Sequence, residues 1–317
     1  MINMMKILFV IFIMLAKCEK IHSQGCCTAG TSSLGGVFRN IVPVNNLSII
    51  AGYENNYLVA SFDGRNEISD PLKRSATVSY LTLQLEYGIS EKVSVLAITS
   101  YTFRERNTTV TSPSDNFQQD VKFSGQGFGD IILLGKYEIV TPDFFSPLTF
   151  AIGGGAKLPV GDFRKKDNGS RLAIDLQPGT GAPDLLLWSY LSNSFTSLSL
   201  SIYGNLLYRY AGTNLDGYKI GDEFLVTLGA NYYFTEYLTF SLQLRSRFAN
   251  ADYADRRTLP STGGTSYDLF PYLNYIEGKF SFSVYTMVPL YRNTRGIQLT
   301  NSQVLGAQLQ YLIDLNN

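Results

Sequence analysis

Apolar and polar residues alternate along most of the chain from Asn46 onward, and connections rich in Gly, Pro, Asn and Asp separate the alternating segments. The clearest segment runs from Tyr237 to Ala249. One face of it would carry Leu238, Phe240, Leu242, Leu244 and Phe248, and the other Thr239, Ser241, Gln243, Arg245 and Arg247. A period of two is the pattern of a β-strand with one apolar face and one hydrated face.

The same pattern recurs often enough to predict an all-β chain. It is clear over residues 76–89 and 196–210, and weaker over 184–192, where Leu185, Leu186, Leu187 and Trp188 are consecutive. We predict about twelve strands, near residues 47–62, 74–89, 93–106, 128–141, 147–158, 184–192, 196–210, 222–234, 237–249, 267–276, 279–291 and 301–315. Because one segment alternates poorly, counts of ten and fourteen strands stay open.

Strand length and connection length favour a membrane barrel over a soluble sandwich. Crossing a bilayer at a tilt takes about 9 to 11 residues per strand, whereas soluble strands average about 5 to 6. Short connections alternate with long polar ones, near 63–73, 107–127, 159–183, 211–221, 250–265 and 292–300. Short periplasmic turns and long external loops are typical of outer-membrane barrels. We therefore predict an antiparallel, up-and-down transmembrane β-barrel, with a soluble periplasmic sandwich or barrel as the alternative.

The N-terminus has the features of an export signal. Lys6 supplies a positive charge, and residues 7–16 form an apolar run that is too short to span a bilayer as a helix. A cleavage site near Ser23-Gln24-Gly25 gives three parts, which are a signal peptide at 1–25, a periplasmic N-terminal segment at 26–45 and an outer-membrane barrel at 46–317. The expected location is the cell outer membrane of a Gram-negative bacterium.

The cysteines leave two alternatives open. Cys26 and Cys27 are adjacent, and one trans peptide holds their Cα atoms too close for an unstrained mutual disulfide. The two cysteines form either a soft-metal site or an intermolecular thiol site. Alternatively, they belong to a periplasmic tail and have no chemical role. A lipoprotein signal that modifies Cys18 or Cys26 is the alternative to the cleavage described above.

Charge and histidine usage exclude several functions. Lys plus Arg equals Asp plus Glu at 26 each, so no net field attracts nucleic acid. The single histidine, His22, lies in the predicted signal, which removes serine-histidine hydrolysis and histidine metal sites from the mature chain. We attribute the carboxylates of Asp162, Asp167, Asp175 and Asp184 to loop solvation. The expectation is a protein without catalytic residues, cofactor or metal.

Several charged residues fall at the alternate strand positions that belong to the hydrated face. An Arg or Lys that faces lipid at the bilayer midplane costs about 2 to 4 kcal/mol, so these side chains are expected inside the barrel. They are Arg104, Lys136, Glu138, Arg209, Arg245, Arg247 and Glu86, with Glu54 and Asp314. Two roles stay open, a ladder of ion pairs that stiffens a plugged barrel and a pore lining that selects solutes.

Three glycine-rich stretches carry a family resemblance. They are Gly127-Phe128-Gly129-Asp130 through Tyr137, Gly153-Gly154-Gly155 through Phe163, and Asp175-Leu176-Gln177-Pro178-Gly179-Thr180 through Asp184. Together they resemble the outer-membrane family labelled as the meta-pathway of phenol degradation, most strongly over residues 127–190. The resemblance implies an outer-membrane protein that passes small, aromatic or apolar solutes, and it carries over no catalytic residue.

The expected function is a passive outer-membrane channel or transporter driven by the solute gradient. The alternative is a closed structural or surface-binding barrel without transport. Expected partners are outer-membrane lipid, a small solute of unknown identity and the barrel assembly machinery, although the chain ends in Leu315-Asn316-Asn317 without the terminal aromatic typical of assembly signals.

Overall fold

The computed structural model describes residues 41–70, 72–111, 118–143, 146–167, 169–254 and 256–315. Strands dominate these ranges, and none of the residues they contain forms a helix long and apolar enough to cross a membrane. The predicted signal peptide, Cys26 and Cys27 lie outside the described residues.

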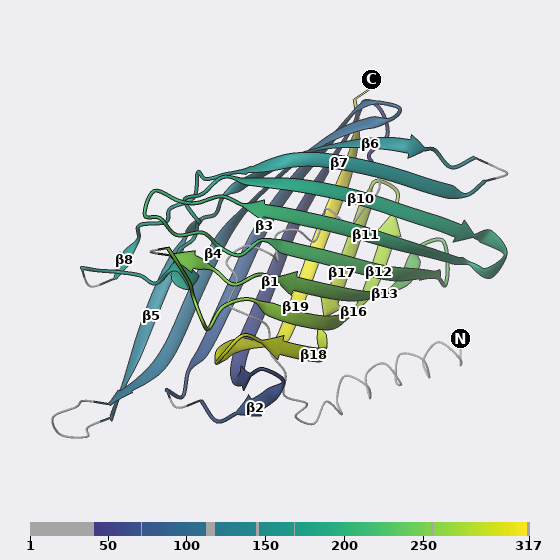
Figure 1. Cartoon of the computed structure of the whole chain (residues 1–317). Coiled ribbons are helices and arrows are strands. Elements are labelled where there is room, and N and C mark those ends of the chain that lie inside the picture. The colour runs from purple at the N-terminus through teal and green to yellow at the C-terminus, as the bar shows by residue number, and fades with distance from the viewer. Residues whose placement is uncertain are drawn as a thin grey trace, which may run out of the picture.

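The wall of the molecule is a closed antiparallel barrel of 12 strands (Figure 1). Two of the 12 are interrupted, β5 with β6 and β17 with β18, and the halves of each are numbered separately. The wall strands are β1 (Asn46–Asp63), β3 (Ser75–Ser90), β4 (Val93–Thr111), β5 (Gln118–Phe128), β6 (Ile131–Val140), β7 (Leu148–Leu158), β10 (Asp184–Phe195), β11 (Leu200–Ala211), β12 (Glu223–Tyr233), β13 (Leu238–Ala249), β16 (Gly264–Glu277), β17 (Phe280–Thr286), β18 (Val288–Thr294) and β19 (Gln298–Asp314).

Neighbouring strands in the chain are neighbours in the sheet, and the barrel closes where β1 pairs with β19. That seam runs from Asn46 opposite Asp314 to Phe62 opposite Gln298. Short elements lie in the connections between the wall strands, namely β2 (Asn66–Ile68), β8 (Lys166–Asp167), β9 (Ser170–Arg171), β14 (Tyr253–Ala254), β15 (Arg257–Thr258) and the 3₁₀ turns η2 (Ile174–Leu176) and η3 (Thr196–Leu198). The predicted fold class is therefore confirmed.

The two ends of the barrel differ. Short turns connect β3 to β4, β12 to β13 and β16 to β17 at the end where the described chain begins and finishes, and there the Leu315 N–H donates to the Asn45 carbonyl. The other end carries the long connections, including residues 159–183 and 250–263. This is the layout of an outer-membrane barrel, with the short turns in the periplasm.

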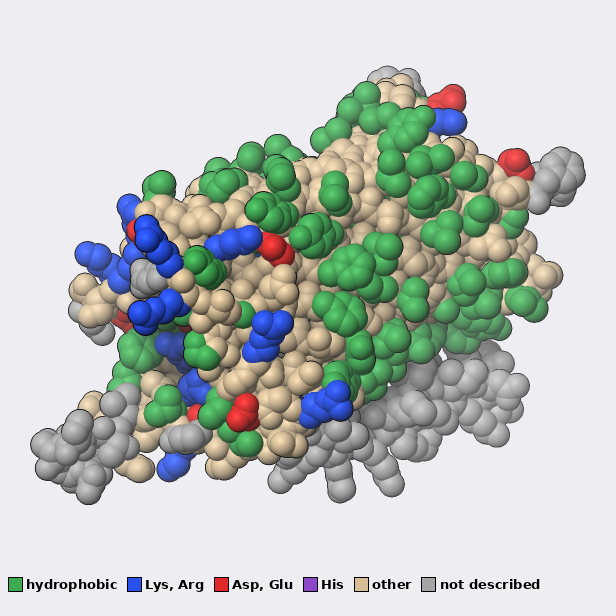
Figure 2. All heavy atoms as spheres, in the orientation of Figure 1, with side chains coloured by type: hydrophobic (Ala, Val, Ile, Leu, Met, Phe, Trp, Pro, Cys, Tyr) green, Lys and Arg blue, Asp and Glu red, His purple; other side chains and the backbone are tan. Residues whose placement is uncertain are grey.

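The outward face is apolar, as the alternation predicts. On β3, Leu81, Leu83 and Leu85 are exposed, whereas the intervening Gln84 is buried. Figure 2 shows hydrophobic side chains spread over the middle of the visible face and charged ones gathered toward the end with the long loops. A surface of this kind is stable only against lipid, which places the protein in the outer membrane.

The inward face differs from the expected hydrated lining, because part of it is apolar. We call this part the apolar layer, formed by Leu96, Ile98, Ile132, Leu134, Ala151, Leu186, Trp188, Leu207 and Leu225 on β4, β6, β7, β10, β11 and β12. It also explains the poor alternation of residues 184–192. Leu185 and Leu187 are exposed to lipid, whereas Leu186 and Trp188 point inward and are buried, so both faces of β10 are apolar.

Several predicted boundaries are wrong, by the most in two places. The expected loop at 107–127 is mostly strand, because β4 continues to Thr111 and pairs with β5 as a hairpin that projects beyond the rest of the barrel (Figure 1). Cross-strand hydrogen bonds hold these polar segments extended, which their composition does not reveal. The strand expected from residue 196 begins at Leu200, since residues 196–198 form the turn η3.

Candidate functional site in the barrel lumen

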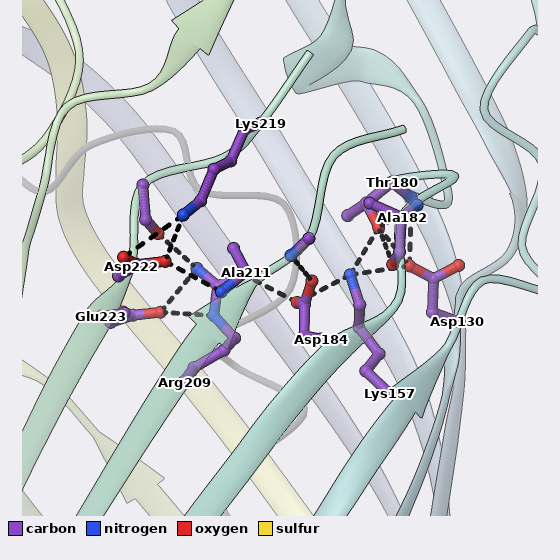
Figure 3. A network of polar contacts seen from close by, with 12 residues as sticks. Asp130, Lys157, Thr180, Ala182, Asp184, Arg209, Ala211, Lys219, Asp222 and Glu223 are labelled. Atoms are coloured by element: carbon purple, nitrogen blue, oxygen red, sulfur yellow. Dashed lines mark hydrogen bonds and ion pairs between the residues drawn. The ribbon is translucent and has the colours of Figure 1, made fainter. Parts of the chain in front are cut away.

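Six charged side chains lie along the inner wall near the loop end of the barrel, about one per strand, and Figure 3 shows five of them, from Asp130 to Glu223. We call them the charge ladder, formed by Asp130, Lys157, Asp184, Arg209, Glu223 and Arg247. The charges alternate in sign. Successive N–O distances are 3.2, 2.9, 3.1 and 3.1 Å, and the last contact joins the Arg247 and Glu223 side chains.

The ladder is buried, so its contribution to the free energy of folding depends on how completely its charges are paired. The side chains of Asp184 and Glu223 are each 1% exposed. Each of these carboxylates contacts two cations, because Asp184 lies between Lys157 and Arg209 and Glu223 lies between Arg209 and Arg247. A buried charge is costly unless it is paired and hydrogen-bonded, and alternation gives every interior member two opposite neighbours.

Asp130, at one end of the ladder, also anchors the loop at 159–183. Its carboxylate accepts hydrogen bonds from Gly161 N–H at 3.1 Å, from Thr180 N–H at 3.1 Å and from the Thr180 hydroxyl at 2.7 Å. The loop backbone packs closely here, because a Cβ on Gly179 would lie 2.5 to 2.7 Å from Gly161 backbone atoms. The three glycine-rich stretches that carry the family resemblance therefore meet at one point, where they fix this loop to the barrel.

The loops enclose a cavity of about 210 Å³ at the mouth. Arg106 reaches it from β4 and pairs with Asp175 of the 159–183 loop at 2.7 Å. Tyr218 and Asp252 lie on the opposite side and are hydrogen-bonded to each other. Burial and then the neighbouring Asp252 carboxylate raise the pKa of the Tyr218 hydroxyl, so this bond keeps its proton on tyrosine. The mouth is thus lined by groups that are already paired.

Other loop carboxylates are held ionised. Hydrogen bonds from Arg171 and then Arg164 lower the pKa of Asp216, which lies on the exposed loop surface. Burial acts to raise the pKa of Asp70, but hydrogen bonds from Arg74, the Leu72 N–H and Ser61 outweigh it, so this pKa is also lowered. Within the described ranges, no group of three His, Cys, Asp or Glu side chains is placed to share a metal ion.

Five of the charged residues predicted to line the lumen lie inside the barrel in two groups. Arg209 and Arg247 belong to the charge ladder. Lys136 and Glu86 form a separate buried pair at 3.1 Å nearer the periplasm, and Glu138 is buried two residues further along the same strand.

The remaining predicted residues act singly. Arg104 donates to the Asp175 carbonyl at 2.8 Å, and the Arg245 guanidinium lies 4.2 Å from the centre of the Phe270 ring. Glu54 accepts a hydrogen bond of 2.7 Å from the Tyr285 hydroxyl. Asp314 still pairs with Asn46 in the seam but is exposed, because it is the last residue of β19 at the periplasmic end of the barrel.

Sequence reasoning assigned Asp184 to loop solvation, and that assignment is wrong. Asp184 is the first residue of β10 and is paired on both sides inside the barrel. It also missed Asp130, Lys157 and Glu223, and the pair of Asp268 with Arg292 on β16 and β18. The sequence does contain a signal for Asp184. Residues 184, 186 and 188 of one strand share a face, so Asp184 points inward with Leu186.

Three inward aromatic rings lie flat over glycines of the neighbouring strand. A Cβ on Gly229 would lie 2.2 Å from the Tyr203 ring, and one on Gly306 would lie 2.1 Å from the Tyr285 ring. Trp188 lies over Gly153 in the same way, with its ring 5.0 Å from the Lys136 ammonium. The missing side chains let each ring lie against the wall instead of across the lumen.

The fold and this lumen define the protein as an outer-membrane β-barrel. The family model described as MetA-pathway of phenol degradation matches residues 75–254, more than half of the chain. The chain belongs to this family. None of the curated proteins compared with the chain matches it.

Solved structures show the same architecture. An outer-membrane channel from Pseudomonas putida F1 is 11% identical, with a TM-score of 0.64 over 88% of this chain and 98% of that one. The toluene transporter TbuX from Ralstonia pickettii is also 11% identical, with a TM-score of 0.42 over 86% of this chain and 91% of that one. The first of these similarities supports the barrel fold.

Proposed function

We propose that the protein is a passive channel for small, uncharged solutes that are aromatic or apolar, with the concentration gradient as the only driving force. The observation that carries the proposal is the apolar layer. Inward positions of a water-filled porin are polar, whereas here Leu96, Leu134 and Leu186 point into the barrel. These side chains are buried against one another, so the proposed route requires an apolar solute to displace them as it passes, in surroundings that water and ions gain little from contacting.

The charges fit the same proposal. Every member of the charge ladder is paired, so the ladder presents three carboxylates and three cations that largely cancel. An ion that entered would compete with contacts of about 3 Å that are already formed. The proposed route needs no chemistry on the solute and therefore no catalytic residue. That the structural neighbour from Pseudomonas putida is itself a channel is consistent with this function.

The charge ladder also supports a second candidate, a closed structural barrel. A continuous line of buried ion pairs stiffens the wall whether or not anything passes. Uptake separates the two candidates. Porin-deficient cells would be compared with and without the protein for uptake of radiolabelled toluene and of benzoate, which is similar in size but charged. Faster uptake of toluene than of benzoate is expected of the channel, and no change for either solute would establish the closed barrel.

A matched pair of variants tests the apolar layer itself. Ala151 lies in the layer and is fully buried, whereas the next residue, Ile152, faces lipid. Ala151→Phe is expected to lower toluene uptake several-fold by filling the lumen, and Ile152→Phe is expected to leave it unchanged. Equal uptake by both variants at equal surface expression would mean that solutes do not pass the layer.

A further inference from the structure

A cavity of about 280 Å³ lies in the periplasmic half of the lumen, between the apolar layer and the short turns. Its wall comes from β10 to β13, β16, β17 and β19. The described residues that line it include four tyrosines, five carboxamides and four hydroxyl side chains from Ser and Thr, and none of them is charged. We call it the tyrosine–amide cavity. Its composition differs from both the charge ladder and the apolar layer.

Aromatic rings form one side of this cavity. Trp188 of the apolar layer stacks on Tyr190 with centroids 6.1 Å apart and ring planes 8° from parallel. Tyr190 stacks in turn on Tyr203 at 6.1 Å and 27°. Because Tyr203 lies over Gly229, its ring follows the wall. The rings thus make a continuous track of flat faces that leads from the apolar layer into the cavity.

Polar atoms without partners lie along the same track. Of the side chains in the described part of the chain that hold buried atoms without a hydrogen-bond partner, Gln243 lines the cavity and has an unpaired carbonyl. Asn205 at both amide atoms, Thr227 at its hydroxyl and Trp188 at its indole nitrogen lie outside the cavity lining. Asn205 is 1% exposed and lies directly opposite Tyr190 in the β10–β11 ladder. Each buried polar group left unpaired costs about 1 to 3 kcal/mol, so a cluster of them favours a bound hydrogen-bonding partner.

The chemistry of the wall restricts what can bind. A charged solute would lose water and meet no countercharge among the lining residues. A hydrocarbon would stack on the rings but leave the Gln243 carbonyl unpaired, the situation that makes polar sites reject apolar analogues. The volume is below the range of about 300 to 1,000 Å³ that is usual for drug-sized ligands, so a single ring suits it.

We propose that the tyrosine–amide cavity is a binding site for a neutral, single-ring solute that carries hydroxyl groups. The ring stacks on Tyr190 and Tyr203, and the hydroxyl groups exchange hydrogen bonds with Gln243 and the other carboxamides of the cavity wall, which can both donate and accept. This proposal rests on the proposed channel function, because the site is its periplasmic stage. Within the aromatic and apolar class it selects solutes by hydroxylation.

Binding is tested directly on the intact barrel in detergent by titration calorimetry, with Trp188 emission as a second readout, since it is the chain's only tryptophan. The probes are catechol, an aromatic diol, and methyl glucoside, a saturated ring with hydroxyl groups. Benzoate and toluene serve as the charged and the unhydroxylated comparators. Heat release with catechol alone assigns the site to hydroxylated aromatics, and heat release with methyl glucoside alone assigns it to sugars. Heat release with both hydroxylated probes also supports the proposal, whereas binding of toluene or benzoate as tight as that of the hydroxylated probes, or no binding at all, overturns it.

Variants locate the binding. Gln243→Leu and Gln308→Leu, at two carboxamides of the cavity wall, are each expected to weaken it about tenfold or more, the loss that follows when one buried hydrogen bond is removed. Gln303→Leu is the matched control, because Gln303 lies on β19 and is exposed. Equal affinity in all three variants would place the probe elsewhere and overturn the site. Uptake without binding would remove this site and leave the channel standing, whereas binding without uptake would support the site and remove the channel.

Discussion

Glycine placement decides where the inward aromatic rings lie. Tyr285 rests on Gly306, and its hydroxyl reaches the carboxylate of Glu54 on β1, beyond the strand that carries the glycine. In the same way Trp188 crosses Gly153 toward Lys136. Each glycine thus allows a side chain to bridge two strands along the wall, which stiffens the barrel and keeps the ring out of the lumen.

Gly306→Ala should destabilise the barrel. The new Cβ would lie 2.1 Å from the Tyr285 ring, so the ring must move and its buried hydrogen bond to Glu54 is lost. We expect a loss of about 1 to 3 kcal/mol in the free energy of unfolding, measured by urea titration of the refolded protein. The control is Gly204→Ala, whose Cβ would meet only Leu228 at an ordinary 3.5 Å. Equal stability of the two variants would show that the ring adapts without cost.

The charge ladder is a property of strands in register. Arg209 and Glu223 are directly opposite in the β11–β12 ladder, as are Lys157 and Asp184 between β7 and β10. Each strand supplies one charge of the sign opposite to its neighbour, so the pairs link five wall strands from β7 to β13 through side chains as well as through the backbone. A slip of one residue in any of these strands would turn its charge toward lipid, and the ladder therefore also specifies register.

Removing one interior charge should be far more costly than removing a surface charge. Glu223→Gln leaves Arg209 and Arg247 without their shared carboxylate, and loss of one partner from a buried pair costs about 3 to 5 kcal/mol. Glu105→Gln, which breaks the exposed pair with Lys122, is expected to cost about 0 to 1 kcal/mol. Urea midpoints of both variants in the same detergent provide the comparison. A small effect of Glu223→Gln would indicate that water reaches the ladder.

The barrel as a whole is closed, but its wall is not uniform around the seam. β19 pairs with β1 along nearly its full length, and on its other side it pairs with β17 over residues 305–311 only. Beyond Met287, β18 pairs with β16 and forms no ladder with β19. Pro289 contributes to this, because it has no N–H to donate to a neighbouring strand.

Hydrogen exchange should reveal this asymmetry within a single strand. Amides of residues 305–311 lie in a ladder on both sides, whereas residues 299–304 have a ladder partner on the β1 side only. We expect residues 299–304 to exchange faster, measured by mass spectrometry on the barrel in lipid nanodiscs. Equal protection of the two halves would mean that β18 and β19 pair in the membrane.

The sequence by itself determined the class of the molecule. Alternation at period two is a local property, so it gave the faces of β3 and β13, the apolar outer surface and the alternation of short and long connections that marks an outer-membrane barrel. The same parity placed Arg209, Arg245 and Arg247 inside. The signal peptide and the barrel assembly machinery stay predictions.

Only the tertiary structure decided which inward residues meet. Parity says which face a side chain occupies but not its level along the barrel axis, and that level depends on the register and stagger of all the strands together. Lys157 and Asp184 are therefore partners across a long loop, and Leu186 and Trp188 share one apolar layer with residues as distant in sequence as Leu96. The charge ladder, the apolar layer and the tyrosine–amide cavity all depend on that shared register, which no single segment encodes.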